Sequence, residues 1–143
     1  MNMDKYKYFE PLRVRFQDTD LQGHVYFGTY LTYFDEGLTG YMHAIGCTYH
    51  DLKEAGVDMF YIHTECDFKS EAFVEETLNV HVRAGKIGNS SLTFEFAAFK
   101  ARNDELIATG NIVAVMVDPQ TKKPLRVPNI FRDAVARYDG KPA

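Results

Sequence analysis

The sequence has no tryptophan, only two cysteines and no excess of basic residues. Its 16 Lys and Arg against 20 Asp and Glu give a formal net charge of −4, which argues against a dedicated nucleic-acid surface. No apolar run approaches the roughly 18 residues of a membrane-spanning helix, so no membrane span is expected. Cys47 and Cys66 lack the spacing of a metal or redox motif, and a reducing cytoplasm is the expected location. Residues 1–8 carry charges and no apolar stretch, so no signal peptide is expected.

The 143 residues are enough for one full hydrophobic core, and we expect a single domain over residues 1–143. Within it, residues 17–45 combine a short polar loop with the one long amphipathic helix that the sequence predicts. Gly46 predicts the end of this helix, and its start is expected near Tyr26 or Phe27. Apolar residues recur there at steps of three and four, the pattern of one buried helical face: Phe27, Tyr30, Leu31, Phe34, Leu38, Tyr41, Met42 and Ile45.

Most of the remaining chain shows the alternation that is typical of β-strands. The predicted strands are residues 6–16, 58–68, 77–86, 90–101 and 106–117. In the first strand, Leu12, Val14 and Phe16 share one face, whereas the last strand is apolar on both faces and is expected to be covered on both. A helical turn is expected at 51–55 and a C-terminal helix at 127–138, starting near Asn129. Because one long helix needs a concave partner, the prediction is an α+β domain in which a curved antiparallel sheet surrounds the helix.

The polar loop before the helix does not fit a metal site. Asp18, Asp20 and Gly23 are spaced as in a calcium loop, but the twelfth position is Thr29 instead of a glutamate, and no helix precedes Asp18. A magnesium-dependent phosphotransfer site would follow an apolar parallel strand, whereas residues 13–16 alternate. The five histidines show no zinc-ligand spacing. No metal is expected.

A different chemistry accounts for the loop better. Gly23 permits a tight turn, and the first N–H groups of the following helix have no partner within the helix. Those donors, with the positive end of the helix dipole, can stabilise an oxyanion. Asp20 would then lie close enough to act as nucleophile or as general base at a carbonyl carbon. A structural role, in which Asp18 and Asp20 only cap the turn, stays open on this reasoning.

Residues 18–27, followed by Tyr30-Leu31 and residues 33–36, resemble the signature of the hotdog-fold acyl-CoA thioesterases. The closest group is the 4-hydroxybenzoyl-CoA thioesterase-like branch, which includes small bacterial Tol–Pal-linked thioesterases. The resemblance continues in order through most of the chain, at residues 66–68, 75–78, 88–92, 117–119, 123–124 and 128.

This resemblance implies a hotdog fold, in which a five-stranded antiparallel sheet wraps around one long central helix. It implies hydrolysis of an acyl-CoA without a cofactor, CoA being part of the substrate. It also implies a homodimer formed by sheet extension, often a homotetramer as a dimer of dimers, with active sites at the dimer interface. Asp20 matches the catalytic carboxylate, and the Phe27 N–H matches the group that polarises the thioester carbonyl. Gly23 shapes the loop, and His24 is expected to line the site and orient Asp20 or water.

The remaining candidate residues would bind the substrate. Tyr26 and Tyr30 are candidates for the acyl pocket, with a role in the core as the alternative. The candidates for the CoA phosphates are Lys69, Arg83, Lys86 and Arg126, with Ser90 and Ser91 as hydroxyl donors. The chain has Glu71-Ala72-Phe73 where the family often has a run such as Pro-Ala-Arg, so one basic contact to CoA is missing there.

Two alternatives to an acyl-CoA thioesterase remain after this reading. One is a thioesterase for acyl carrier protein, which the acidic balance of the chain disfavours. The other is a catalytically silent hotdog module that binds acyl-CoA or a protein. A hotdog dehydratase is disfavoured because the sequence lacks the His-and-carboxylate pair of that branch.

Overall fold

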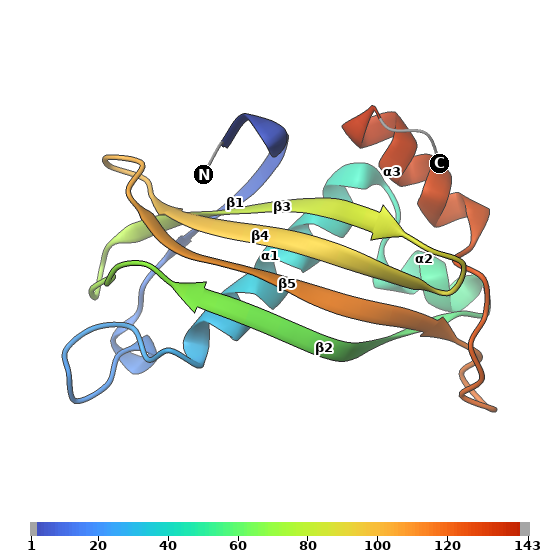
Figure 1. The fold of residues 1–143 in the computed structure, drawn as a ribbon, viewed down its shortest axis with the longest axis horizontal. Helices are drawn as coiled ribbons and strands as arrows, with labels where there is room; N and C mark the ends of the chain where they lie inside the picture. The colour runs from blue at the N-terminus through green and yellow to red at the C-terminus, as the bar shows by residue number, and fades with distance from the viewer. Residues whose placement is uncertain (1–2, 141–143) are drawn as a thin grey trace.

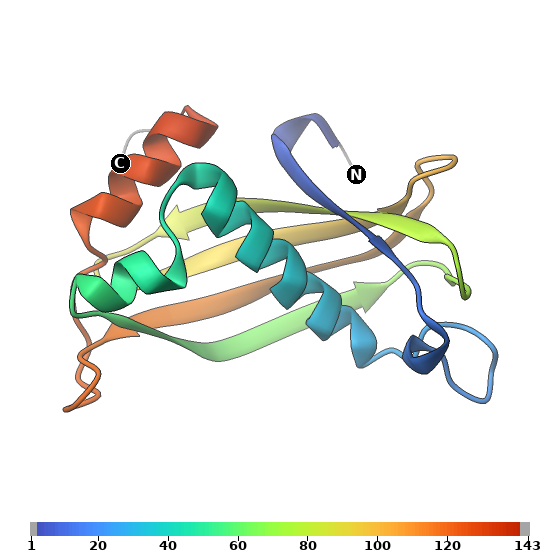
Figure 2. The same ribbon diagram turned by 180° about the vertical axis from the view of Figure 1, so that it is seen from behind.

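The structure is a computed structural model that describes residues 3–140. One antiparallel sheet, in the order β1-β3-β4-β5-β2, curves around α1 (Figures 1 and 2). Its strands are β1 (Tyr8–Arg13), β2 (Asp58–Phe68), β3 (Thr77–Ile87), β4 (Ser91–Lys100) and β5 (Leu106–Val117). The helices are α1 (Thr29–Ile45), α2 (Tyr49–Glu54) and α3 (Asn129–Asp139), with 3-10 turns η1 (Met3–Lys5) and η2 (Phe16–Asp18). The predicted α+β architecture, five antiparallel strands around one long helix, is confirmed.

The long helix α1 buries the face that its sequence pattern predicts. Phe34, Leu38 and Met42 are fully buried against the sheet. The helix lies close to β3 at Gly37, where a Cβ would lie 2.8 Å from a methyl group of Val80. It ends at Gly46 in the left-handed conformation, as predicted. Among residues 3–140, no helix is long and apolar enough to cross a membrane.

The start of α1 differs from the prediction, because the helix begins at Thr29 and not near Tyr26 or Phe27. The N–H groups of Thr29, Tyr30 and Leu31 each donate to the carbonyl three residues earlier. The first turn is therefore of the tighter 3-10 type. Phe27 and Leu31 also leave the predicted core face, with side chains 60% and 38% exposed.

The first strand is shorter than predicted at both ends. Before it, the Tyr6 N–H donates to the Met3 carbonyl, and Tyr6 packs with Ala97 and Phe99 in a small cluster apart from the main core. After it, the chain turns into η2, where the Phe16 side chain is 84% exposed. The prediction that Phe16 belongs to the strand and shares a face with Leu12 and Val14 was therefore wrong.

The strand β5 is paired on both sides, with β4 and with β2. On its face toward α1, Ile112, Ala114 and Met116 are buried. On the opposite face, Val113 and Val115 stay partly exposed. The prediction of a strand covered on both faces is thus confirmed for one face and wrong for the other.

The helix α1 crosses the sheet diagonally (Figure 2) and packs mainly on β1 and β3. It leaves the edge strand β2 poorly covered, so that large apolar side chains of β2 are exposed: Phe60 by 38%, Ile62 by 60% and Phe68 by 50%. Two pockets open at the boundary between α1 and β2: one is lined by Leu31 and Asp35 of α1 and by residues 61–64 of β2, and the other also by Tyr49 of α2.

Candidate functional site

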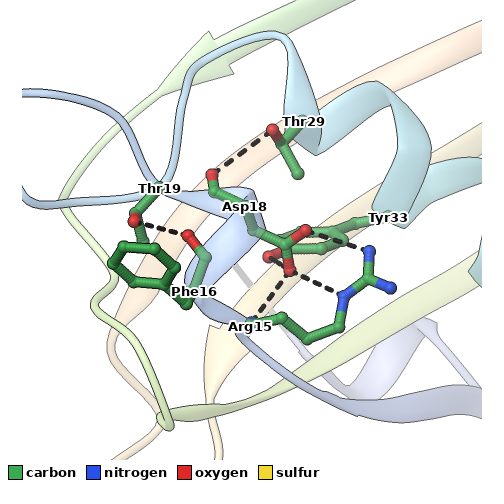
Figure 3. A network of polar contacts seen from close by, with 6 residues as sticks. All are labelled: Arg15, Phe16, Asp18, Thr19, Thr29 and Tyr33. Atoms are coloured by element: carbon green, nitrogen blue, oxygen red, sulfur yellow. Dashed lines mark hydrogen bonds and ion pairs between the residues drawn. The ribbon is translucent and has the colours of Figure 1, made fainter.

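Asp18 anchors the loop that precedes α1, and Figure 3 shows it between Arg15, Tyr33 and Thr29. Its side chain is 4% exposed and accepts hydrogen bonds from the Arg15 N–H at 2.9 Å and the Tyr33 hydroxyl at 2.8 Å. The Arg15 guanidinium forms an ion pair with it at 3.0 Å. Burial raises the pKa of the Asp18 carboxyl, but the hydrogen bonds from Arg15 and Tyr33 outweigh burial, and the pKa lies below its ordinary value. Asp18 therefore has the structural role that the sequence left open.

Asp20 lies in a tight turn held by its own backbone. Its N–H donates to the His24 carbonyl at 3.1 Å, and its carbonyl accepts from the Gly23 N–H at 2.9 Å. Gly23 has φ +85°, a conformation that other residues rarely adopt. The Asp20 carboxylate is partly exposed, and its one hydrogen bond among residues 3–140 comes from the Gln22 N–H at 2.9 Å. Asp18 is thus engaged on both oxygens, whereas Asp20 keeps accepting capacity for a ligand or water.

Two backbone donors lie free at the start of α1. Within residues 3–140, neither the Phe27 N–H nor the Gly28 N–H has a hydrogen-bond acceptor. The preceding N–H, of Tyr26, donates to the Asp18 carbonyl, and the following one, of Thr29, donates to the Tyr26 carbonyl. Adjacent free donors at the positive end of a helix can stabilise a negatively charged oxygen.

A pocket of about 330 Å³ opens beside these donors. Its lining residues are His24, Val25, Phe27, Tyr30, Phe68, Lys69, Ser70 and Glu71. The structure thus brings together four of the residues that the sequence proposed: His24, Phe27, Tyr30 and Lys69. Asp20 is not part of the lining, but its backbone bond to His24 ties it to the pocket wall.

The three ring residues of this region have distinct surroundings. The His24 Nδ1–H donates to the Val25 carbonyl at 3.1 Å, which leaves Nε2 as the acceptor of the neutral ring. Tyr30 is 3% exposed, and burial raises the pKa of its hydroxyl to about 12, so it stays protonated at neutral pH. Tyr26 is 47% exposed and its ring packs at a tilt against that of Phe27, with ring centroids 4.6 Å apart.

The other candidates for CoA phosphates lie elsewhere in the chain. Arg83, Lys86, Ser90 and Ser91 belong to the end of β3 and the turn into β4, at the opposite end of the sheet from the loop (Figure 1). Arg83 forms an ion pair with Glu95 at 3.3 Å. Arg126 lies at this same end, where it donates to Asn129 at the start of α3. A single chain does not bring these five residues to Asp20.

Four lining residues were not proposed from the sequence: Val25, Phe68, Ser70 and Glu71. Phe68 is the last residue of β2, and Ser70 and Glu71 follow it in the segment where only Lys69 had been singled out. The Ser70 hydroxyl donates to Glu105 at 2.6 Å, and the Ala72 carbonyl accepts from the Val25 N–H at 2.9 Å, so this segment is fixed against the loop. The departure from the family pattern at residues 71–73 was the signal that could have directed attention to it.

No metal centre is formed by the residues that the structure describes. Between residues 3 and 140, no group of three or more His, Cys, Asp or Glu side chains is placed to hold a metal ion. The polar atoms of the loop instead present one carboxylate and two N–H donors, a set that suits acyl chemistry.

Comparison with known proteins adds to this geometry. The model of the thioesterase-like superfamily matches residues 14–135. The acyl-CoA thioesterase YbgC of Haemophilus influenzae is 27% identical over 125 residues, covering 87% of this chain and 90% of that protein. The 1,4-dihydroxy-2-naphthoyl-CoA hydrolase of Gloeothece citriformis is 29% identical over 131 residues, covering 88% and 90%. The solved structure of a 1,4-dihydroxy-2-naphthoyl-CoA thioesterase from Synechocystis is similar with a TM-score of 0.85 at 19% identity, covering 92% of this chain and 97% of that one.

Proposed function

The chain belongs to the thioesterase-like superfamily and has the hotdog fold, and from this premise we propose that it hydrolyses acyl-CoA thioesters to a carboxylic acid and CoA. The proposal depends on one observation: the free N–H groups of Phe27 and Gly28, the available carboxylate of Asp20 and a pocket all lie near the start of α1. The relatives named as an acyl-CoA thioesterase and a 1,4-dihydroxy-2-naphthoyl-CoA hydrolase support a CoA thioester as the substrate.

In the proposed reaction, the thioester carbonyl oxygen accepts hydrogen bonds from the N–H groups of Phe27 and Gly28. This oxygen becomes negatively charged when the tetrahedral intermediate forms. The two donors and the dipole of α1 therefore interact more strongly with the transition state than with the substrate, which is the requirement for catalysis. Phe27 is 60% exposed and lines the pocket in which the thioester would bind.

Asp20 supplies the carboxylate of the proposed reaction. As a general base it takes a proton from water, the water oxygen adds to the carbonyl carbon, and collapse of the intermediate expels the CoA thiolate, which is then protonated. As a nucleophile it forms a mixed anhydride with the acyl group, which water then cleaves. A single turnover in ¹⁸O-water identifies a covalent route in which water attacks the Asp20 carbonyl carbon of the anhydride, because ¹⁸O then enters Asp20 and an Asp20 oxygen leaves in the product acid. In either route, His24 orients Asp20 or the water.

The open edge of β2 supports a dimer. Within the described residues 3–140 this strand pairs only with β5, and its exposed apolar side chains include Phe60, Ile62 and Phe68. We propose that two copies pair antiparallel through β2. That pairing would place the turn between β3 and β4 of one copy, with Ser90, at the same end as the loop of the other. The candidate phosphate contacts that lie far from Asp20 in one chain would then face the CoA bound by the partner copy.

The test is release of CoA thiol from a panel of acyl-CoAs by the wild type and by Asp20→Asn. Asp133→Asn is the matched control, because it removes one exposed carboxylate on α3, away from the site. We expect kcat to fall roughly 10²-fold or more in Asp20→Asn and to stay unchanged in Asp133→Asn. Equal turnover in wild type and Asp20→Asn would refute the assignment of Asp20. Absence of turnover with every acyl-CoA would refute the proposed activity and favour a carrier-protein substrate or a silent binding module.

A further inference from the structure

One wall of the site pocket belongs to the segment that joins β2 to β3. Residues 69–71 of this segment line the pocket. The next residue, Ala72, is fully buried, and its carbonyl accepts from the Val25 N–H at 2.9 Å. No helix or strand includes residues 69–76, so the regular hydrogen bonds of secondary structure do not fix the shape of this wall. Figure 1 shows the segment at the same end of the sheet as the loop before α1 and the turn from β4 to β5.

Lys100, the last residue of β4, packs against this segment. It is 4% exposed and is the one buried lysine or arginine among residues 3–140. Its ammonium nitrogen lies 3.2 Å from Glu76 Oε1, 3.6 Å from Glu105 Oε1 and 5.5 Å from the centre of the Phe73 ring. Lysine is rarely buried unless its charge is paired, because removing an ammonium group from water is unfavourable. The two carboxylates and the aromatic ring supply that compensation.

Glu76 connects Lys100 to the C-terminal end of the segment. Glu76 Oε1, which pairs with the ammonium, also accepts from the Phe73 N–H at 3.0 Å. The Glu76 N–H donates back to the Phe73 carbonyl at 3.1 Å, which closes a tight turn. Burial alone would raise the pKa of the Glu76 carboxyl, but the hydrogen bonds from Phe73, Lys100 and Arg102 outweigh burial and lower the pKa. Glu76 therefore stays ionised at neutral pH and holds both the ammonium and the turn.

Glu105 connects Lys100 to the N-terminal end of the segment. The Ser70 hydroxyl donates to Glu105 Oε2 at 2.6 Å, while Oε1 faces the ammonium. The Lys100 N–H donates to the Glu105 carbonyl at 2.8 Å, and the N–H groups of Lys69 and Ser70 donate to the Ile107 carbonyl at 2.8 Å and 3.2 Å. One ammonium thus lies between two carboxylates, each of which holds a different end of the segment.

We propose that Lys100 is a positioning residue of the site pocket: its charge holds residues 69–76 in the shape that lets residues 69–71 bind the substrate. This inference rests on the proposed acyl-CoA hydrolysis and adds a residue to the site. Lys100 does not line the pocket, so it acts through Glu76 and Glu105 and not by contact with the substrate.

Removal of the ammonium should loosen the wall and leave the reacting groups in place. Two carboxylates of like charge would then face the same space. The Glu105 side chain is 43% exposed and that of Glu76 is 16% exposed, so Glu105 would turn toward solvent and release Ser70. Asp20 is held by its own turn, and the two free N–H donors belong to the start of α1. Substrate binding should therefore weaken, while the chemical step changes little.

The test is the steady-state kinetics of thiol release by Lys100→Met, which keeps most of the side-chain length and removes the charge. We expect KM to rise roughly three- to tenfold, the effect of losing about one hydrogen bond, and kcat to change less than about twofold. Ser70→Ala should also raise KM, and the double variant should be little worse than Lys100→Met, because both changes break the same link. Lys53→Met is the matched control, since it removes an exposed lysine of α2 and should keep the wild-type KM.

A merely structural role of Lys100 would lower stability and leave the KM of the folded protein unchanged. A wild-type KM in Lys100→Met, shown to be folded by circular dichroism at the assay temperature, would therefore overturn the inference and leave the proposed hydrolysis intact. If Lys100→Met does not fold, Glu105→Ala tests the same link, because it releases Ser70 and leaves Lys100 paired with Glu76. Glu105→Ala should raise KM, and an unchanged KM would again overturn the inference. Failure of the wild type to hydrolyse any acyl-CoA would instead overturn the proposed function, and the inference about Lys100 with it.

Discussion

Removing the Tyr33 hydroxyl by Tyr33→Phe should destabilise the protein through the loop and leave the packing of the ring intact. In the structure this hydroxyl donates to the buried Asp18 carboxylate at 2.8 Å. Hydrogen bonds to charged groups contribute about 1.5–3 kcal/mol, and Asp18 keeps its bonds to Arg15 in the variant. We therefore expect a loss near the lower end of that range, about 1.5 kcal/mol, or a decrease in Tm of about 5 °C for a chain of this size.

The assay is urea denaturation at pH 7 with Tyr26→Phe as the matched control. The Tyr26 side chain is 47% exposed, and its hydroxyl has no hydrogen bond among the described residues, so the control should lose less than about 0.5 kcal/mol. Because the folded-state pKa of Asp18 is lowered, the stability that its charge contributes is present above the ordinary carboxyl pKa of about 3.9 and is lost as the pH falls. The difference between wild type and Tyr33→Phe should therefore shrink on acidification. This account of Asp18 would be refuted if Tyr33→Phe lost no more stability than Tyr26→Phe at pH 7. It would also be refuted if the stability difference between wild type and Tyr33→Phe grew at low pH.

Two further predictions follow from the backbone and from a buried imidazole. In Gly23→Ala the new methyl group would meet no atom within 4 Å, so only the left-handed backbone conformation is unfavourable. We expect urea denaturation to show a free energy of unfolding that is lower by about 1–2 kcal/mol. The distorted turn should also lower kcat in the thiol-release assay. His81 is 7% exposed, and its Nδ1 has no hydrogen-bond partner among residues 3–140. Burial lowers the pKa of its imidazole, and the smaller opposite effect of Asp104 leaves that pKa below its ordinary value. Wild-type stability should therefore fall as the pH decreases below about 6.5, the ordinary histidine pKa, and His81→Phe should remove this part of the pH dependence in parallel denaturation curves. A pH dependence that is unchanged in His81→Phe would contradict the prediction.

The sequence predicted those parts of the structure that depend on local periodicity. The spacing of Phe34, Leu38 and Met42 defines the buried face of α1, and Gly46 ends it, because both signals act within a few residues. The boundaries of β2 and β5 also agree with the prediction, since alternating or continuous apolar runs mark them. Phe16 was misplaced because the chain leaves the sheet for η2 there, and nothing in the local pattern distinguishes a strand end from a turn.

The different roles of the two loop aspartates could not be read from the sequence. Asp18 is buried by contact with Tyr33, fifteen positions later, and only the folded loop shows that this contact exists. In the same way, the order of the strands decides that Ser90 lies at the opposite end of the sheet from Asp20. The spacing of residues along the chain does not show that Asp18 contacts Tyr33, nor that Ser90 is far from Asp20. The hydrogen bonds between the Tyr49 and Tyr61 hydroxyls and from the Tyr61 hydroxyl to Asp35 also depend on tertiary structure, because they join α2, β2 and α1.

The tight first turn of α1 limits what its N-terminus can recognise. A regular helix leaves four N–H groups free, enough to surround several oxygens of a phosphate. Here the N–H groups of Thr29, Tyr30 and Leu31 are already used within the turn, and that of Tyr26 is used by Asp18. Among the described residues, only the N–H groups of Phe27 and Gly28 remain free at this helix start, two neighbouring donors that suit a single oxygen atom. In the proposed reaction this helix start would bind one carbonyl oxygen, and other groups would bind the phosphates of the CoA ester.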